Sequence, residues 1–443
     1  MRGAVSQVAQ SDMDKKRVVV TGMGCITPLG HDIEDVWRRL CNGESGIAPT
    51  TLFDAATFPT MFSAEVKNFD LRAFLGDRAA KHGDASRNSA FALAAAHIAW
   101  KHAGLPEYDG LDPARVGIYL GAGEAPLDFE SVALAGAQAW DQQTGVLNMD
   151  TWAELAHGSF TEEKEHCQEA NLAGAHLACF FNAQGPNFGT LTACAASTQA
   201  IGEACTWIRR GDVDVVISGG THSMIHPLGV TGFNRLTALS TRNDDPQGAS
   251  RPFDRERDGF VLGEGSGIVI LESADHAKAR GATAFAEVAG YGSTADAFRI
   301  TDIHDEARGS SAAMRLAMED AGLKPEDIDY INAHGTGTKE NDSVETLAIR
   351  KVFGDRAPKI AISSIKSMMG HLIAAAGVVE LITCILAIRD GIIPPTINYK
   401  TPDPACDLDY VPNEARKTPV NVALSNSFGF GGQNDTLIVR RFE

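Results

Sequence analysis

The chain has 443 residues, of which 44% are hydrophobic and 22% are charged, so it is long enough for two or three domains or for one duplicated fold. Its formal net charge of −18 argues against non-specific nucleic-acid binding, which depends on Lys and Arg. No uninterrupted apolar run reaches the ~18 residues of a membrane span, so none is expected.

Residues 1–16 lack the apolar core of a signal peptide, and we expect a flexible N-terminal extension there. The eight cysteines show neither CxxC spacing nor a metal-ligand pattern with histidines. This pattern predicts reduced thiols, a cytoplasmic location and no metal site built from cysteine and histidine.

The predicted elements follow a repeated α/β order. A β-branched run at 17–24 predicts a buried strand that ends at glycines. Residues 86–104 carry apolar side chains at helical spacing, with Ser86 placed to cap the helix, and a strand is expected at 117–124. The same order of helix, Ala-Gly-Leu and apolar strand returns at 310–338. The chain therefore reads as two similar halves.

Two Ala-rich segments support this repeat. One begins at Cys194 and the other at His371, and each is expected to be a buried helix with a reactive side chain at its N-terminus. An internal repeat on this scale predicts an N-terminal half at 17–280 and a C-terminal half at 281–443, which form one active site between them. The first half is longer before its Ala-rich segment, which predicts an insertion near 124–170.

Cys194 is the first candidate for chemistry, because free backbone N–H groups and the dipole at a helix N-terminus favour a thiolate. A cysteine among small residues is equally compatible with buried packing. A lone histidine is usually structural, but His334 in NAHGTGT and His371 in KSMMGH both lie close to glycines at the ends of predicted elements. In SNSFGFGGQN (425–434), Gly431 and Gly432 would let backbone N–H groups approach a ligand, although a plain turn is the alternative.

The blocks TACAAST, NAHGTGT, KSMMGH and NSFGFGG, in this order, resemble those of the elongating β-ketoacyl-acyl carrier protein synthases, above all ketoacyl synthase II. Ketosynthase subunits of polyketide systems are a close alternative. RVVVTGMGCITPLG, RPFDRERDGFVLGEG and PPTINY also match, so the resemblance runs from residue 17 to the C-terminus. It implies a thiolase-like α/β fold with a duplicated, five-layered α-β-α-β-α architecture. It also implies a homodimer, or a heterodimer with a homologous subunit.

The resemblance implies a decarboxylative condensation that extends an acyl chain by two carbons in fatty-acid synthesis. Cys194 would hold the acyl chain, and His334 and His371 would donate hydrogen bonds to the thioester carbonyl of malonyl-acyl carrier protein. The backbone N–H groups of Cys194 and Phe430 would form a second oxyanion hole. Lys366 matches a lysine of the family near the second histidine, and a structural ion pair is the alternative for it.

The implied partner is an acyl carrier protein, and no cofactor is expected beyond the phosphopantetheine arm that it carries. Thr336, Thr338 and, less closely, Thr301 match hydroxyls that bind this arm in the family. The resemblance also suggests a structural cation site, at Asn332, Glu345, Glu380, Ser425 and Asn426. Because carrier proteins are acidic, a local basic patch is expected, with the candidates Arg78, Lys81, Arg87, Arg235 and Arg242.

Glu124 departs from the family pattern, because an apolar residue near the acyl pocket is usual there. A carboxylate beside an apolar pocket favours shorter or more polar acyl chains. Other classes explain the motifs less well. Thiolases and starter synthases use a different set of groups, a chain-length-factor subunit lacks the nucleophile, and a cysteine hydrolase leaves the second histidine unexplained.

Overall fold

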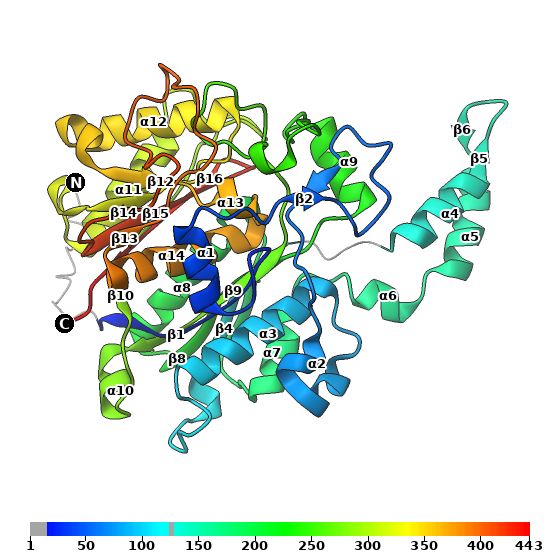
Figure 1. Cartoon of the computed structure of the whole chain (residues 1–443). Coiled ribbons are helices and arrows are strands. Elements are labelled where there is room, and N and C mark those ends of the chain that lie inside the picture. Colours follow the sequence, from blue (N-terminus) through cyan, green and yellow to red (C-terminus); the bar gives the residue numbers. More distant parts are fainter. Residues whose placement is uncertain (1–15, 124–127) are drawn as a thin grey trace, which may run out of the picture.

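The computed structural model describes residues 16–123 and 128–443 (Figure 1). Its main feature is a ten-stranded sheet with the strand order β12-β11-β15-β16-β10-β1-β9-β8-β4-β7. The bounds of these strands are β1 (Val18–Ile26), β4 (Val116–Ala122), β7 (Asn187–Thr190), β8 (Val215–His222), β9 (Gly265–Ser273), β10 (Ala286–Ala295), β11 (Tyr330–Asn332), β12 (Ala361–Ser363), β15 (Val422–Gly429) and β16 (Gln433–Arg440).

The sheet consists of two halves with the same topology. In the first half, β1 and β8 each pair antiparallel with β9, and β8 and β7 each pair parallel with β4. In the second half, β10, β16, β15, β11 and β12 repeat these pairings in the same order and directions. Two residue pairs between β1 and β10 join the halves. The duplicated α/β architecture expected from the sequence is therefore confirmed.

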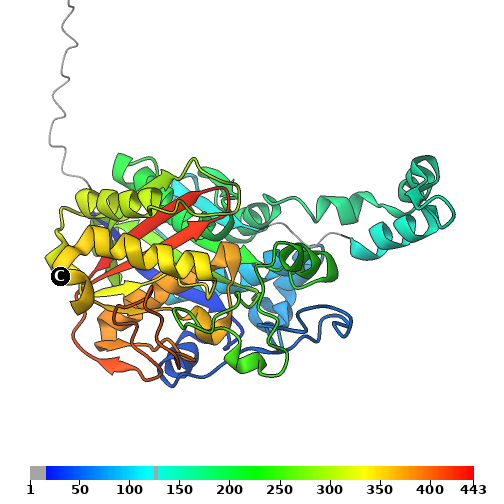
Figure 2. The ribbon, with the colours of Figure 1, turned by 90° about the horizontal axis from the view of Figure 1, so that it is seen from above.

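Helices cover both faces of the sheet and fill the space between its halves (Figures 1 and 2). α3 and α7 pack on the first half, α11 and α12 on the second, and α8 and α14 lie between them. This arrangement gives the five layers expected. The bounds are α3 (Arg87–His102), α7 (Leu172–Phe181), α8 (Ala196–Arg210), α11 (Arg308–Ala321), α12 (Lys339–Phe353) and α14 (Ala376–Asp390).

Shorter elements complete the body of the protein, and none of the helices among the described residues is long and apolar enough to cross a membrane. Their bounds are α1 (Ile33–Cys41), α2 (Leu71–Leu75), η1 (Gly76–His82), α9 (Pro227–Arg235), α10 (Ala274–Ala279), α13 (Lys366–Met369), β2 (Ala48–Pro49), β3 (Phe62–Ser63), β13 (Ile392–Ile393) and β14 (Arg416–Lys417).

The two central helices are buried because their surfaces are small or apolar all round. In α14 every residue from Ala376 to Ile388 is buried. At the crossing of α8 and α14, a Cβ added to Gly377 would lie 2.0 Å from the hydroxyl of Thr198. A glycine is therefore required for the helices to approach this closely.

The start of each central helix differs from the expectation. Three-residue 3₁₀ turns, η3 (Ala193–Ala195) and η7 (Ile373–Ala375), precede α8 and α14. Both turns begin at a residue with positive φ, +49° at Ala193 and +46° at Ile373. The structural counterpart of Cys194 is therefore Ala374, and the expected equivalence of Cys194 with His371 is wrong by three residues.

The cap expected for α3 also differs. Ser86 does occupy the N-cap position, but its hydroxyl contacts the side chains of Asn88 and Ser89 and no backbone N–H group.

Residues 128–170 form an arm that projects from the body (Figures 1 and 2). It contains α4 (Phe129–Ala139), the hairpin of β5 (Trp140–Asp141) and β6 (Val146–Leu147), α5 (Met149–Ser159) and α6 (Glu162–His166). Leu134, Trp140, Val146 and Met149 of the arm are each more than half exposed. The expected N-terminal extension, apart from Lys16, lies outside the described residues, and so does Glu124.

Candidate active site

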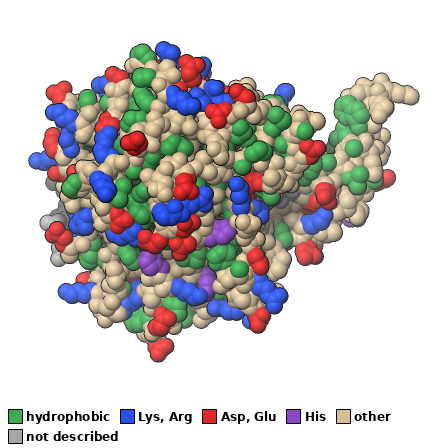
Figure 3. Space-filling model, viewed as in Figure 1, with side chains coloured by type: hydrophobic (Ala, Val, Ile, Leu, Met, Phe, Trp, Pro, Cys, Tyr) green, Lys and Arg blue, Asp and Glu red, His purple; other side chains and the backbone are tan. Residues whose placement is uncertain are grey.

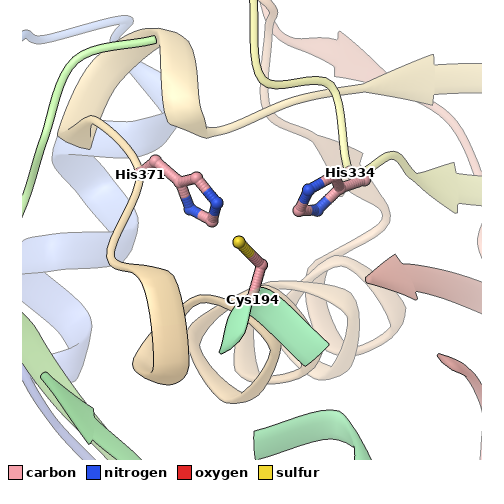
Figure 4. A group of neighbouring side chains, drawn as sticks. All are labelled: Cys194, His334 and His371. Carbon is pink, nitrogen blue, oxygen red and sulfur yellow. The ribbon is translucent and has the colours of Figure 1, made fainter. Parts of the chain in front are cut away.

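Cys194, His334 and His371 meet in one buried group (Figure 4). Cys194 lies in η3, His334 follows β11, and His371 follows α13. The sulfur of Cys194 and one ring nitrogen of each histidine all lie within 4.8 Å of one another. All three residues are at most 7% exposed, so the sheet halves and both central turns enclose them.

Local backbone geometry positions Cys194. The left-handed conformation of Ala193, which is unfavourable for a residue with a Cβ, turns the chain immediately before the cysteine. The β15–β16 hairpin approaches from the other side. A Cβ added to Gly429 would lie 3.2 Å from the backbone nitrogen of Cys194 and 3.0 Å from the carbonyl oxygen of Thr192, so glycine permits this contact.

Burial raises the pKa of the Cys194 thiol to about 12. The charge of Lys366 and the backbone N–H groups of Phe430 and of Cys194 itself lower this pKa, but they do not offset the loss of hydration. The thiol is therefore protonated at neutral pH. Burial thus acts against the thiolate that a helix N-terminus would favour.

This pKa has a measurable consequence. Alkylation of Cys194 by iodoacetamide should accelerate about tenfold per pH unit between roughly pH 7 and pH 9, without a plateau, because the thiolate fraction rises throughout this range. Intact-protein mass spectrometry of the labelled enzyme, with Cys194→Ser as the background control, gives the rate. A plateau below pH 8 would show a stabilised thiolate in place of the thiol.

His334 is held as a neutral side chain with its proton on Nε2. Its ring pKa lies well below the usual value, mainly because of burial and then because of the charge of Lys366. The ammonium Nζ of Lys366 lies 3.5 Å from Nδ1, and an ammonium can only donate, so Nδ1 accepts and Nε2 carries the proton. Glu345 fixes the backbone by accepting from the N–H groups of His334, at 2.9 Å, and Gly335, at 2.8 Å.

His371 reaches the same state through a different contact. Nδ1 accepts a hydrogen bond from the backbone N–H of Ile373 at 3.2 Å, which leaves the proton on Nε2. This Nε2 has no hydrogen-bond partner among the described residues. Burial lowers the pKa of His371 well below its usual value, so the ring is neutral at physiological pH. The two histidines therefore present two N–H donors beside the sulfur of Cys194.

Lys366 connects His334 to the core of α14. Its ammonium donates to the carbonyl oxygen of His334 at 2.6 Å and forms an ion pair with Glu380, and both side chains of the pair are 2% exposed. Burial raises the pKa of Glu380, and the charge of Lys366 opposes this. The structural ion pair that was the alternative at the sequence level is thus present, and Lys366 hydrogen-bonds to His334, the first histidine in the sequence motifs.

Removing one partner of this pair should destabilise the protein strongly. Lys366→Met leaves the carboxylate of Glu380 buried without its counter-charge, so we expect a loss of about 3–5 kcal/mol in the free energy of unfolding. Urea denaturation at fixed protein concentration measures the loss. The double variant Lys366→Met, Glu380→Leu should recover part of it, and equal stability of the wild-type protein and the single variant would contradict the prediction.

A cavity of about 450 Å³ leads to Cys194 and is lined by residues of both halves. Thr301, Thr336 and Thr338 all line it, and the hydroxyls of Thr336 and Thr338 lie 2.9 Å apart. Phe430 also lines it. Of the residues predicted to act in catalysis or to bind the phosphopantetheine arm, all except Lys366, which hydrogen-bonds to the backbone of His334, border this cavity.

Two aromatic residues complete the site and were missed at the sequence level. The ring centres of Phe260 and His371 lie 5.4 Å apart and those of Phe428 and His334 lie 5.8 Å apart, and both pairs pack edge to face. Both lie in the glycine-containing blocks FVLGEG and NSFGFGG. An aromatic side chain next to such glycines was the available signal.

The residues suggested for a cation site are all buried. Glu345 is occupied as an acceptor for His334, Gly335 and Asn426. In contrast, the side-chain amide of Asn332, the hydroxyl of Ser425 and Oε2 of Glu380 have no partner within the described residues. Buried oxygens without partners fit a small cation, which prefers oxygen ligands.

Comparisons with known proteins agree with this geometry. Residues 15–277 match the family described as the β-ketoacyl synthase N-terminal domain, and residues 285–400 match its C-terminal domain. The chain belongs to the β-ketoacyl synthase family. It is 43% identical to a 3-oxoacyl-[acyl-carrier-protein] synthase 2 of Coxiella burnetii, over 97% of this chain and 99% of that one. It is 44% identical to the protein of that name in Synechocystis, over 98% and 100%.

Solved structures of this family have the same fold. The ishigamide ketosynthase/chain length factor is 35% identical with a TM-score of 0.85, over 97% of this chain and 100% of that one. A type II polyketide ketosynthase in complex with its acyl-carrier protein, bound to the hexaketide, is 33% identical with a TM-score of 0.84 and the same coverage. The fold and the family predicted from the sequence are thus confirmed.

Proposed function

We propose that this protein is a β-ketoacyl-acyl carrier protein synthase of fatty-acid elongation. The observation that carries the proposal is the meeting of Cys194 with two neutral histidines that both present Nε2–H. The relatives named 3-oxoacyl-[acyl-carrier-protein] synthase 2 support the same reaction. A ketosynthase subunit of a polyketide system is the second candidate, favoured by the solved structures of that class.

In the first step, Cys194 attacks the thioester of the acyl carrier protein. The sulfur of Cys194 bonds to the acyl carbonyl carbon, the bond to the carrier sulfur breaks, and the proton lost from the thiol ends on the carrier thiol. The backbone N–H groups of Cys194 and Phe430 stabilise the oxyanion that forms on the carbonyl oxygen. Because the thiol is protonated at rest, its deprotonation accompanies or precedes the attack.

In the second step, malonyl-carrier replaces the free carrier. His334 and His371 donate from Nε2 to the malonyl thioester oxygen while the bond to the carboxylate breaks and CO2 leaves. The electron pair of that bond becomes an enolate, whose carbon attacks the acyl carbonyl on Cys194. The sulfur of Cys194 leaves and takes a proton, and the product is a 3-oxoacyl-carrier that is two carbons longer. Thr301, Thr336 and Thr338 bind the phosphopantetheine arm.

The decisive test is reconstitution. Intact-mass spectrometry should show an acyl adduct on Cys194 after incubation with acyl-carrier protein, and a 3-oxoacyl-carrier after malonyl-carrier is added. An adduct without any 3-oxoacyl product would refute the elongation step. A single extension from straight-chain primers supports fatty-acid elongation, whereas repeated extension without reduction supports the polyketide alternative.

The active form in this proposal is a dimer in the cytoplasm. β7 lies at one edge of the ten-stranded sheet, and Phe188 of β7 and Leu191, which follows it, are each more than half exposed. Unpaired edge strands are templates for pairing with another chain, so β7 is suited to meet a second subunit. All eight cysteines are free, as in most cytoplasmic proteins.

Basic residues of the expected carrier patch differ in their contacts. Arg87 is partly exposed and forms an ion pair with the buried Glu264, and Arg78 stacks on the ring of Phe180. On the face in Figure 3, basic and acidic side chains are interspersed. Arg235 is exposed at the end of α9, next to Leu236 at the lining of the cavity, so it is the strongest remaining candidate.

Charge reversal tests this residue. Arg235→Glu should raise the KM for malonyl-carrier about tenfold at low salt and less at high salt, because the acidic carrier is then repelled at the entrance. Lys278→Glu on α10, on the far side of Figure 1 from α9, is the matched control and should leave KM unchanged. A salt-independent KM that is the same in both variants would exclude Arg235 from docking.

A further inference from the structure

His222 is a buried histidine without any hydrogen-bond partner. It ends β8, is 3% exposed, and neither Nδ1 nor Nε2 has a partner within the part of the chain that the structure describes. A neutral imidazole carries one N–H donor and one acceptor, and buried polar groups are almost always paired. Two free ring nitrogens in one buried side chain therefore require an explanation.

The face of β8 that carries His222 points toward the catalytic layer. Thr221 donates its hydroxyl to the backbone of Asn88 in α3, on the outer face of the sheet. Side chains alternate along a strand, so Gly220 and His222 share the opposite face. A Cβ added to Gly220 would lie 2.5 Å from the carbonyl oxygen of Ala374 and 2.7 Å from Cβ of Ser197.

These contacts place the imidazole near the reacting groups. Ser197 follows Cys194 by three residues, and Ala374 follows His371 by three residues. The charge of a protonated His222 would act on His371 and lower its pKa, as expected for a near neighbour. Ile225, which lies three residues after His222, packs in the apolar cluster that contains Cys194, Phe233 and Ile373.

The neighbouring strand makes room for this ring. β4 runs parallel to β8, and the residue that follows its end is Gly123. A Cβ added to Gly123 would lie 2.1 Å from Nδ1 of His222, so only glycine leaves space for the imidazole. Burial, followed by the charge of His226, lowers the pKa of His222 to about 3, so the ring stays neutral. A neutral ring suits a neutral hydrogen-bonding ligand.

We propose that His222 is a specificity-determining residue that binds an oxygen substituent, a hydroxyl or a ketone, on the acyl chain carried by Cys194. The apolar cluster around Cys194 accepts the alkyl part of the chain, and the imidazole donates its N–H to the oxygen. This inference rests on the proposed function, because it requires an acyl chain on Cys194. It adds that the enzyme distinguishes oxygenated chains from plain alkyl chains of equal length.

Single-turnover acylation of Cys194 tests the proposal. The probes are carrier-bound octanoyl, 3-hydroxyoctanoyl, 5-oxo-octanoyl and 7-oxo-octanoyl chains, and the readout is the rate of each relative to octanoyl. At least one oxygenated chain should react about tenfold faster than octanoyl in the wild-type enzyme, the size expected for one buried hydrogen bond. His222→Leu should bring this ratio to about one, and His222→Gln, which keeps a donor, should retain part of it.

His97→Leu, a change at a half-buried histidine of α3 that contacts Phe180, is the control and should keep the wild-type ratio. Equal rates for all four chains in the wild-type enzyme overturn the inference without any variant, so misfolding of His222→Leu cannot obscure the result. An unchanged ratio in a folded His222→Leu protein overturns it as well. Failure of every chain to acylate Cys194 would instead refute the proposed function, and the inference with it.

Discussion

Cys194→Ala should abolish condensation while leaving measurable decarboxylation of malonyl-carrier. The variant has no sulfur to hold an acyl chain, so formation of 3-oxoacyl-carrier should fall to background. The two histidines do not depend on the sulfur for their geometry. His334 is held by Lys366 and Glu345, and His371 by the backbone N–H of Ile373. Their Nε2–H donors should still stabilise the enolate that forms as CO2 leaves.

Release of labelled CO2 and formation of 3-oxoacyl-carrier, measured in parallel, separate the two steps. Cys205→Ala is a suitable control, because Cys205 is a buried cysteine of α8 that lies outside the catalytic group. It should retain both activities. If decarboxylation in folded Cys194→Ala were also at background, the division of labour between the sulfur and the histidines would be wrong.

His371→Leu should show the opposite separation. It removes one of the two proposed donors to the malonyl thioester oxygen, and the loss of a donor of this kind costs about 2.7–4 kcal/mol, or roughly 10²–10³-fold in rate. Decarboxylation and condensation should both fall by this factor. Acylation of Cys194 should be much less affected, because its oxyanion is stabilised by backbone N–H groups that this substitution does not remove.

His371→Asn offers a conservative comparison, since an amide can accept from Ile373 and donate into the site, and it should lose less activity than His371→Leu. The rates of acylation and of CO2 release, measured for each variant, show whether His371 acts in one step or in both. Acylation that falls as far as decarboxylation would show that His371 acts in both steps and would contradict the separation.

Local sequence patterns were sufficient to predict these helices and strands and the order of the motifs along the chain. The β-branched run at 17–24, the segment at 86–104 with apolar side chains at helical spacing, and the two Ala-rich segments all correspond to observed elements. The reason is that period, caps and glycines act over a few residues. The repeated order of helix and strand was sufficient to predict that the fold is duplicated. The same strand pairing in both halves of the sheet confirms this prediction.

Tertiary structure alone decided the chemical state of the site. Burial, which depends on distant segments, raises the pKa of the Cys194 thiol, whereas the helix N-terminus that favours a thiolate is local. The tautomer of His334 is set by Lys366, and Arg87 is held in an ion pair by the buried Glu264. The equivalence of the two central turns could be found only from the backbone structure, because the sequence does not reveal the positive φ at Ala193 and Ile373.

The sequence by itself thus determined which residues occur at the ends of strands and helices. These residues were sufficient to predict the family and the candidate catalytic side chains. The structure decided which of these groups meet, which are charged and which lack partners, as at His222. The physical reason is that hydration and hydrogen bonding depend on all neighbours in space, and at Cys194 these neighbours include His334 and His371, which are remote in the sequence.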